Sequence, residues 1–283
     1  MAKSLEEFRC RQRSTPDWIL PGLLKRGNTL FIIGAPKKAC KSWLMLAAAW
    51  DLSEGEPVWG LKRSDGEYLL KPSRPMRTVY LAQEDTEDDV HDRLSAHFSQ
   101  GRAANDRLWI VPKNLKIRLD SERGCALLEE ELDAVANGCG KIDLVMFDPF
   151  RRMHHGDEND SLAIAKIWGV LESVHRRYGC ATIISHHTVK PPADRSLFDP
   201  TDPFIARGSG DIYGGGDAFI NVVPKRLEND PPSRKVALYF ESKRGRPLAP
   251  AMVKVHFDTG AVEWLGAAWE RKEREEEGHI GAG

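Results

Sequence analysis

Cysteine is scarce in this sequence, and long apolar runs are missing from it. The five cysteines are scattered, odd in number and without a Cys-x-x-Cys pair, which argues against a disulfide framework and against structural zinc. No stretch approaches the roughly 18 apolar residues that a membrane span needs, and the polar beginning MAKSLEEFRCRQRS lacks the apolar region of a signal peptide. We therefore expect a soluble, cytoplasmic protein without membrane association.

An excess of charge of either sign is missing too, because 41 Lys and Arg residues face 42 Asp and Glu residues. The formal net charge of -1 demands no polyanionic partner, although a locally basic surface could still bind one. Repeats and long linkers are also absent from the sequence, so we expect one domain over residues 16–265. A charged lead-in, 1–15, and a charged tail, 266–283, are expected to flank it.

What the sequence does contain is an alternation of apolar strands and helical segments. Strands are expected at 29–33, 78–82, 108–112, 142–148 and 181–187. Such an alternation predicts an α/β fold with a mostly parallel central sheet flanked by helices. Three closely spaced strands without intervening helices predict an antiparallel C-terminal extension, at 219–223, 235–242 and 252–258. Gly- and Pro-rich composition predicts a surface excursion at 53–75 and long mobile loops at 188–216.

The loop after the first strand has the chemistry of a phosphate-binding loop. The pattern Gly-x-x-x-x-Gly-Lys-Ser/Thr lets backbone N–H groups converge on phosphates, while the Lys binds phosphate oxygens and the hydroxyl holds Mg²⁺. Lys41 and Ser42 stand at the helix start as required, but Ala35 and Cys40 replace the two glycines. The candidate nucleotide-binding residues are Gly34, Ala35, Pro36, Lys37, Lys38, Ala39, Cys40, Lys41, Ser42 and Trp43.

Cys40 is the weak point of this assignment, and alone the segment fits a plain strand-to-helix turn equally well. If the backbone keeps a conformation that glycine favours, the side chain costs strain on the order of 1–3 kcal/mol. Otherwise the loop relaxes outward and the nucleotide site is only partly formed. Either route predicts weakened nucleotide binding. We also expect a lowered pKa for the Cys40 thiol, because Lys41 follows it.

Two other strands are followed by or end in carboxylates, at the edge where a parallel sheet collects its ligands. Glu84 comes just after the strand 78–82 and is placed to orient a water for attack on the γ-phosphate, or else it belongs to the acidic cap of the next helix. Asp148 ends the strand 142–148 in the manner of a Walker B carboxylate that reaches Mg²⁺. Each signal alone is common by chance. Together with the Lys41 loop they predict ATP hydrolysis, with Mg²⁺ held through Ser42 and Asp148.

Four segments carry a family resemblance: YLAQEDTEDDVHDRL, DLVMFDPFRRMHH, TIISHHTVK and ARGSG. Over roughly residues 16–250 the chain resembles the RecA-like hexameric helicases, and among them the small RepA helicases of broad-host-range plasmids. The resemblance implies a RecA-like P-loop core, a hexameric ring with ATP hydrolysed between subunits, and single-stranded DNA in a central channel. The family carries glycine before the loop lysine, so Cys40 departs from it.

The resemblance also implies roles for single residues. Lys41 and Ser42 would act on phosphate and Mg²⁺, Glu84 would orient water, and Asp148 would be the Walker B acid. His187, or His186, would be a sensor at its strand end. Arg207 would be an arginine finger that acts on the neighbour's nucleotide, with Lys243 and Arg244 as second candidates.

Several alternatives remain open at this stage. An ATPase of the same fold could load a partner or serve recombination without unwinding, and a degenerate ring could act as a scaffold with weak turnover. The His and acid residues at 154–160 look like a metal site, but a solvated loop fits them better. By the resemblance, Arg151 and Arg152 face the channel and meet phosphates. The loop 188–211 suits single-stranded DNA or a simple lid.

Overall fold

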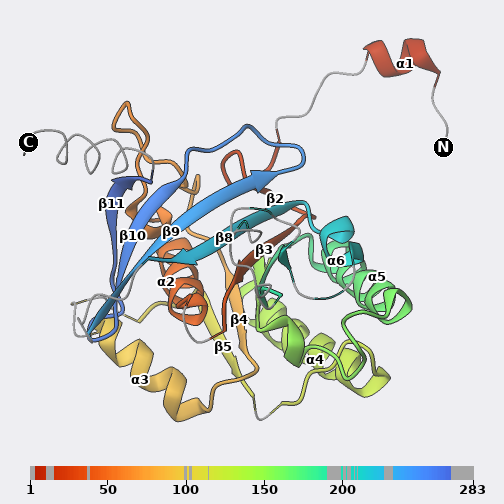
Figure 1. Ribbon diagram of the computed structural model, residues 1–283. Helices are drawn as coiled ribbons and strands as arrows, with labels where there is room; N and C mark the ends of the chain where they lie inside the picture. The colour runs from red at the N-terminus through yellow and green to blue at the C-terminus, as the bar shows by residue number, and fades with distance from the viewer. Residues whose placement is uncertain are drawn as a thin grey trace, which may run out of the picture.

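A nine-stranded sheet organises the computed structural model, in the order β11-β10-β9-β8-β3-β7-β6-β4-β5 (Figure 1). The structure describes residues 4–10, 16–36, 39–98, 101, 104–113, 115–189, 199, 202, 205–206, 208, 210–225 and 232–268. The six strands from β8 to β5 in this order run parallel to their neighbours. They are β3 (Thr29–Gly34), β4 (Thr78–Ala82), β5 (Leu108–Pro112), β6 (Leu144–Asp148), β7 (Ala181–His187) and β8 (Ala218–Pro224).

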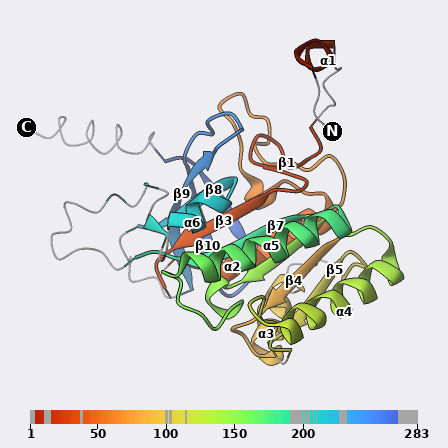
Figure 2. The same ribbon diagram turned by 90° about the vertical axis from the view of Figure 1, so that its right-hand side faces the viewer.

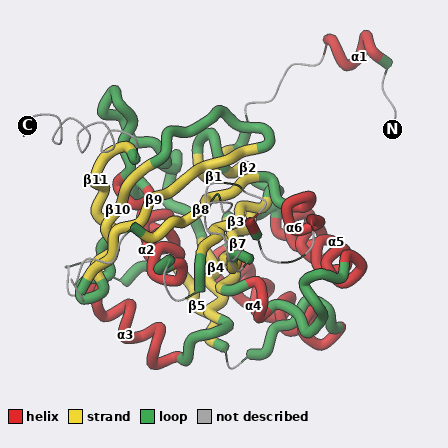
Figure 3. The backbone as a smooth tube through the Cα atoms, viewed as in Figure 1, coloured by secondary structure: helices red, strands yellow, loops and turns green. Residues whose placement is uncertain are grey.

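The remaining strands of the sheet are antiparallel and follow β8 along the chain. They are β9 (Ser233–Ser242), β10 (Ala251–His256) and β11 (Val262–Ala267). Figure 3 shows them as one flank of the yellow sheet. The predicted α/β class, with a mostly parallel sheet and an antiparallel C-terminal extension, is therefore confirmed. One detail differs, because β8 was expected in the antiparallel part and pairs in parallel with β3 on its other side.

Helices cover both faces of the sheet, as continuous apolar strands require. One apolar core lies between the sheet and α2 (Lys41–Glu54), with α3 (Glu87–Phe98) at its edge. The other lies under α4 (Glu122–Cys139), α5 (Ser161–Tyr178) and the short α6 (Gly210–Gly215). Figure 2 shows α4 and α5 lying along the strands. No helix among the described residues has the length and apolar character of a membrane span.

Smaller elements correct parts of the sequence reading. The region 53–75 is no mere surface excursion, because its 3-10 turn η1 (Val58–Gly60) buries Trp59, whose Nε1 donates to the Leu44 carbonyl at 2.9 Å. The region 188–216 was expected to be loop only, yet it contains α6, which the apolar side chain of Ile212 anchors in the core. The sequence reading also missed β11, the hairpin of β1 (Trp18–Leu20) and β2 (Leu24–Lys25), and the helix α1 (Leu5–Cys10). The 3-10 turn η2 (Phe150–Arg152) follows β6.

Candidate nucleotide-binding site

Four parallel strands deliver the predicted residues to one edge of the sheet. β3 ends at Gly34, opposite His187 at the end of β7, and β6 ends at Asp148, opposite Ala82 at the end of β4. This is the edge where ligands of open α/β sheets bind. The register therefore brings the Lys41 loop and three of the predicted polar residues to one side of the molecule.

Lys41, the first residue of α2, is almost buried, with 7% of its surface exposed. Its Nζ donates to the carbonyls of Gly34 at 2.9 Å and Ala35 at 3.3 Å, and lies 3.2 Å from Nδ1 of His187. Burial lowers the pKa of Lys41 to about 8, against the opposing charges of Asp148 and Glu84. The loop is thus folded onto its own lysine, which must turn from two carbonyls to meet a phosphate.

The loop backbone explains which of its residues are replaceable. Gly34 is required because a Cβ there would lie 2.5 Å from Cβ of Ala39, which is itself buried. Cys40 has φ 53° and ψ 27°, the left-handed conformation that glycine favours. The structure thus shows the strained arrangement rather than an outward relaxation of residue 40. Pro36 is exposed, and Lys37 and Lys38 lie outside the described residues.

The expectation for the Cys40 thiol was wrong in sign. Burial raises the pKa of Cys40, and the nearby charges of Arg234 and Lys41 only partly oppose it. The Sγ atom lies 4.0 Å from a guanidinium nitrogen of Arg234, on β9. The local sequence shows the neighbouring Lys41, which lowers the pKa of the thiol. It does not show the burial of the thiol, which raises that pKa by more.

Asp148 is held by two hydroxyl groups from the strands on either side of β6. Tyr80 on β4 donates from its hydroxyl to Oδ2 at 2.7 Å, and Ser185 on β7 donates to Oδ1. Asp148 is 4% exposed, and these two bonds fix the direction of its carboxylate. Asp148 and Ser42, which lies in the first turn of α2, both offer oxygen atoms of the kind that Mg²⁺ prefers. The residues present therefore fit Mg²⁺ and a nucleotide triphosphate.

Glu84 and the cap of α3 are separate features. Thr86 caps the helix, because its Oγ1 accepts from the Asp89 N–H at 3.1 Å and Asp89 accepts from the Thr86 N–H at 2.9 Å. Asp85 binds the guanidinium of Arg93. Glu84 itself is exposed, and its charge acts on Lys41. Glu84 is therefore not needed to cap α3. It follows β4 at the sheet edge that carries Lys41.

Of the two adjacent histidines, His187 is the one that lies at the loop lysine. His186 points to the other face of β7 and is fully buried, with its ring centroid 5.0 Å from that of Phe150 and 6.2 Å from that of Phe31. The alternation of side chains along a strand produces this division. The structure thus favours His187 over His186 as the residue that contacts the site.

The profile of the AAA domain family matches residues 2–193 of this chain. The chain belongs to the AAA domain family. Among solved structures, a KaiC-like protein from the hyperthermophilic archaeon Pyrococcus horikoshii is similar at 12% sequence identity, with 87% of this chain and 93% of that chain covered and a TM-score of 0.49. The AAA domain match ends just after β7, so β8 to β11 lie beyond it. Family membership confirms a P-loop ATPase, and it leaves unwinding and ring assembly as predictions.

Lys243 and Arg244, the second candidates for the arginine finger, lie far from the Lys41 loop of the same chain. Lys243 and Arg244 follow Ser242, which pairs with Ala218 and so lies beside the start of β3, at the sheet edge opposite Lys41. Lys243 donates to the Gly214 carbonyl at 3.0 Å, and Arg244 is exposed. Arg207 lies outside the described residues.

Sequence reasoning missed four side chains of the AAA domain site: Tyr80, Ser185, Arg93 and Arg234. Tyr80 and Ser185 had a usable signal, since each is a polar residue inside an apolar strand and such residues need buried partners. Arg93 and Arg234 had none, because their positions depend on how distant segments pack.

The cluster at 154–160 is neither a metal site nor simply solvated. No group of metal-ligating side chains was found within the described part of the AAA domain protein. His155 and Asp157 are exposed as expected, but His154 and Glu158 are 2% and 4% exposed, with Nε2 and Oε1 3.8 Å apart. The aromatic ring of Phe150, 5.0 Å from that of His154, contributes to their burial.

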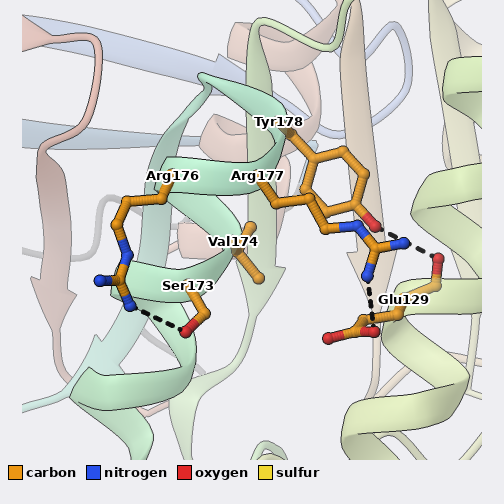
Figure 4. Close-up of a pocket in the computed structure, with 6 residues that line it drawn as sticks. All are labelled: Glu129, Ser173, Val174, Arg176, Arg177 and Tyr178. Atoms are coloured by element: carbon orange, nitrogen blue, oxygen red, sulfur yellow. Dashed lines mark hydrogen bonds and ion pairs between the residues drawn. The ribbon is translucent and has the colours of Figure 1, made fainter.

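A cavity of about 310 Å³ between α4 and α5 is unrelated to the AAA domain site (Figure 4). It lies by the C-terminal end of α5, which leads into the start of β7 and therefore belongs to the opposite sheet edge. Its Arg177 binds Glu129 at 2.7 Å and Asp133 at 2.6 Å. The charge of Arg177 is thus neutralised within the protein, and Arg176 donates to Oγ of Ser173 at 3.3 Å.

Proposed function

We propose that this AAA domain protein is a DNA-stimulated ATPase that works as a hexameric ring, with DNA unwinding as its activity. The observation that carries the proposal is the convergence of the Lys41 loop, Asp148 and His187 at one edge of the sheet, with Glu84 beside them. A phosphate-binding lysine, an oriented carboxylate and a second carboxylate for water are the parts that phosphoryl transfer needs.

The mechanism follows from what each side chain can do. Lys41 leaves the carbonyls of Gly34 and Ala35 and binds phosphate oxygens of ATP, which supply stronger, charged acceptors. Glu84 accepts a hydrogen bond from the attacking water and orients it. Asp148 and Ser42 would hold Mg²⁺, which neutralises charge on the phosphates when bound. His187 then loses its contact with Nζ of Lys41, so the segment after β7 can respond to the nucleotide.

Assembly into a ring is supported by the location of the basic candidates. Lys243 and Arg244 lie at the sheet edge opposite their own Lys41, so a role on a γ-phosphate requires the nucleotide of another subunit. An arginine supplied in trans contributes about 10³–10⁵ in rate in other phosphoryl-transfer proteins. A shared site would therefore make hydrolysis depend on ring formation.

Nucleic-acid binding is supported by a group of arginines at the edge where β6 ends. Arg151 and Arg152 are exposed on η2, and Arg118 comes from the segment between β5 and α4. Burial lowers the pKa of the Arg118 guanidinium, and so do the charges of Arg152 and Arg151, while Asp120 opposes them. Clustered guanidinium groups bind a phosphate backbone in a salt-dependent manner.

A scaffold with weak turnover is the second candidate, and Cys40 is the observation that favours it. A non-glycine residue in the left-handed conformation departs from the loop pattern, and the loop lysine must leave two carbonyls before it can bind a phosphate. An ATPase assay with and without single-stranded DNA separates the two. Stimulation by DNA supports the motor, whereas nucleotide binding without turnover under both conditions supports the scaffold.

Unwinding of a forked DNA duplex then tests the helicase activity itself. ATP-dependent strand separation supports the proposal, and DNA-stimulated hydrolysis without separation would identify a loader or recombination ATPase. The Lys41→Ala protein is the control for contaminating activity. If that variant hydrolyses ATP at the wild-type rate, the Lys41 loop is not the nucleotide site.

A further inference from the structure

Four side chains from separate segments lie next to one another in a row at the beginning of α2, and this row is called the stack below, although its two rings are tilted by 55°. The guanidinium of Arg93 on α3 lies 5.6 Å from the ring of Trp43 on α2. The Trp43 ring is 5.6 Å from that of Phe257, just after β10, and the guanidinium of Arg234 on β9 lies 5.8 Å from the Phe257 ring. Cations therefore occupy both ends of an aromatic pair.

The Arg234 end of the stack lies at the loop itself. A guanidinium nitrogen of Arg234 is 4.0 Å from Sγ of Cys40, the N-cap residue just before α2. Strand pairing explains this contact, because Gly34 at the end of β3 pairs with Val222, and Val222 pairs with Leu238 of β9. The beginning of β9 is thereby brought to the edge of the sheet from which the Lys41 loop departs.

The beginning of α2 is also where a nucleotide would place its phosphates. The first N–H groups of a helix have no partner within the helix, and α2 has 14 residues whose dipole favours an anion at this end. Cys40 makes no side-chain hydrogen bond to cap the first turn. A phosphate bound here would meet both Lys41 and the guanidinium of Arg234.

We propose that Arg234 is a second cationic ligand of the phosphate chain of the bound nucleotide, acting in the same subunit as Lys41. The inference rests on the proposed function, since it requires the nucleotide to bind at the Lys41 loop. A guanidinium suits phosphate because its planar N–H donors form charge-assisted bonds to two oxygens. The Phe257 ring lies against this group and restricts its orientation.

Arg234 would supply a second positive charge at the beginning of α2. A guanidinium stays protonated in proteins, so the charge of Arg234 would be permanent. The second glycine of the loop pattern is replaced by Cys40, the residue that Arg234 contacts. A permanent cation from a C-terminal strand would therefore act beside Lys41 on the same phosphate chain.

Isothermal titration with Mg-ADP and with a non-hydrolysable Mg-ATP analogue tests this role without relying on turnover. We expect Arg234→Gln to weaken both nucleotides by about tenfold to a hundredfold, the loss expected for a charge-assisted hydrogen bond. Arg234→Lys should recover part of the affinity, because it keeps the charge. Lys235→Gln is the matched control, since the next side chain of a strand points to the opposite face of the sheet.

The design separates failure of the inference from failure of the proposed function. If Lys41→Met loses nucleotide while Arg234→Gln binds as tightly as wild type, Arg234 is not a ligand and only the inference falls. If wild type and Lys41→Met bind equally, the nucleotide site is elsewhere and both fall. Should Arg234→Gln fail to fold, Phe257→Leu replaces it: weaker binding of both nucleotides supports the inference, and wild-type affinity overturns it.

Discussion

The Nζ atom of Lys41 lies 3.2 Å from Nδ1 of His187, and this contact joins the phosphate-binding loop to the end of β7. Burial lowers the pKa of Lys41 to about 8, so the balance between its charged and neutral forms depends on pH just above neutrality. A bound polyphosphate would change this balance by stabilising the charged lysine.

We predict that nucleotide binding at pH 8–9 is accompanied by proton uptake, because phosphate raises the depressed pKa of Lys41. Titration calorimetry in buffers of different ionisation enthalpy measures the uptake. The same lysine should make the nucleotide-free protein more stable as pH rises from about 8 to about 10.5, since the unfolded chain then binds more protons. Nucleotide binding at pH 8–9 without proton uptake would contradict this prediction.

Tyr80→Phe should reduce the affinity for Mg²⁺-nucleotide by about tenfold, because Asp148 loses one of the two hydroxyl donors that orient it. The measurement is the Mg²⁺ dependence of nucleotide binding. Tyr178→Phe is the matched control, since it removes a similar bond of 2.8 Å, from Tyr178 to Asp133, near the opposite sheet edge. Equal effects of the two variants would mean that the loss is one of general stability.

Cys40→Gly should stabilise the fold by at most about 1 kcal/mol while leaving nucleotide affinity within about threefold. The reason is that Cys40 has its left-handed conformation in the nucleotide-free structure. Strain present both with and without ligand cancels from the binding equilibrium. Urea unfolding and nucleotide titration measure the two quantities. A gain of tenfold or more in affinity would show that residue 40 changes conformation when phosphate binds.

Acid should unfold the protein partly through Asp143, a side chain 1% exposed at the opposite edge of the sheet. Burial raises its pKa, but hydrogen bonds from Arg74, from the Arg77 N–H and from Arg26 more than offset this and lower it to about 2. The stabilisation is present above about pH 4 and is lost as pH falls through about 2, an effect of about 2 kcal/mol.

Urea unfolding between pH 2.5 and pH 7 measures this contribution. Asp143→Asn should flatten the acid limb of the pH profile and lower stability at pH 7 by about 3 kcal/mol, because two arginines lose a buried partner. Asp17→Asn, the exposed partner of Arg26, should cost less than about 1 kcal/mol. An unchanged acid limb in Asp143→Asn would assign the acid sensitivity to other carboxylates.

Mixing Arg207→Ala protein with Glu84→Gln protein should restore part of the ATPase rate. Each variant keeps the residue that the other lacks, so some interfaces of a mixed ring contain both. The rate is measured against the mixing ratio. A rate that never exceeds the weighted average of the two parents would exclude Arg207 as a finger in trans. The same experiment with Arg244→Ala then tests the second candidate.

The site residues that the sequence could predict are those that follow directly from an apolar strand. Asp148 and His187 end such runs, so a local pattern sufficed. Arg234 and Phe257 could not be placed this way, because their contact with the loop arises from the antiparallel pairing of strands about 200 residues further along the chain. The prediction for the pKa of Cys40 failed for a related reason, because the burial of this side chain depends on tertiary packing.

For the fold, too, prediction from the sequence worked only where a local pattern existed. Alternating strands and helices fixed the parallel core to within a few residues, because each strand is buried on both faces and reads as a continuous apolar run. Trp59 was missed as an anchor because one large side chain among Gly and Pro residues does not create a periodic pattern. The side chain of Trp59 is buried and donates to the Leu44 carbonyl, a contact that the local sequence does not reveal.

The stack of Arg93, Trp43, Phe257 and Arg234 has a consequence for folding during synthesis on the ribosome. The loop lysine is made within the first fifth of synthesis, but Arg234 and Phe257 are made within the last fifth. Contacts of such large sequence separation form late, after loop closure has been achieved. A nascent chain that stops after β7 should therefore carry the loop and still gain little stability from nucleotide, so ATP would assist folding only once β9 and β10 have emerged.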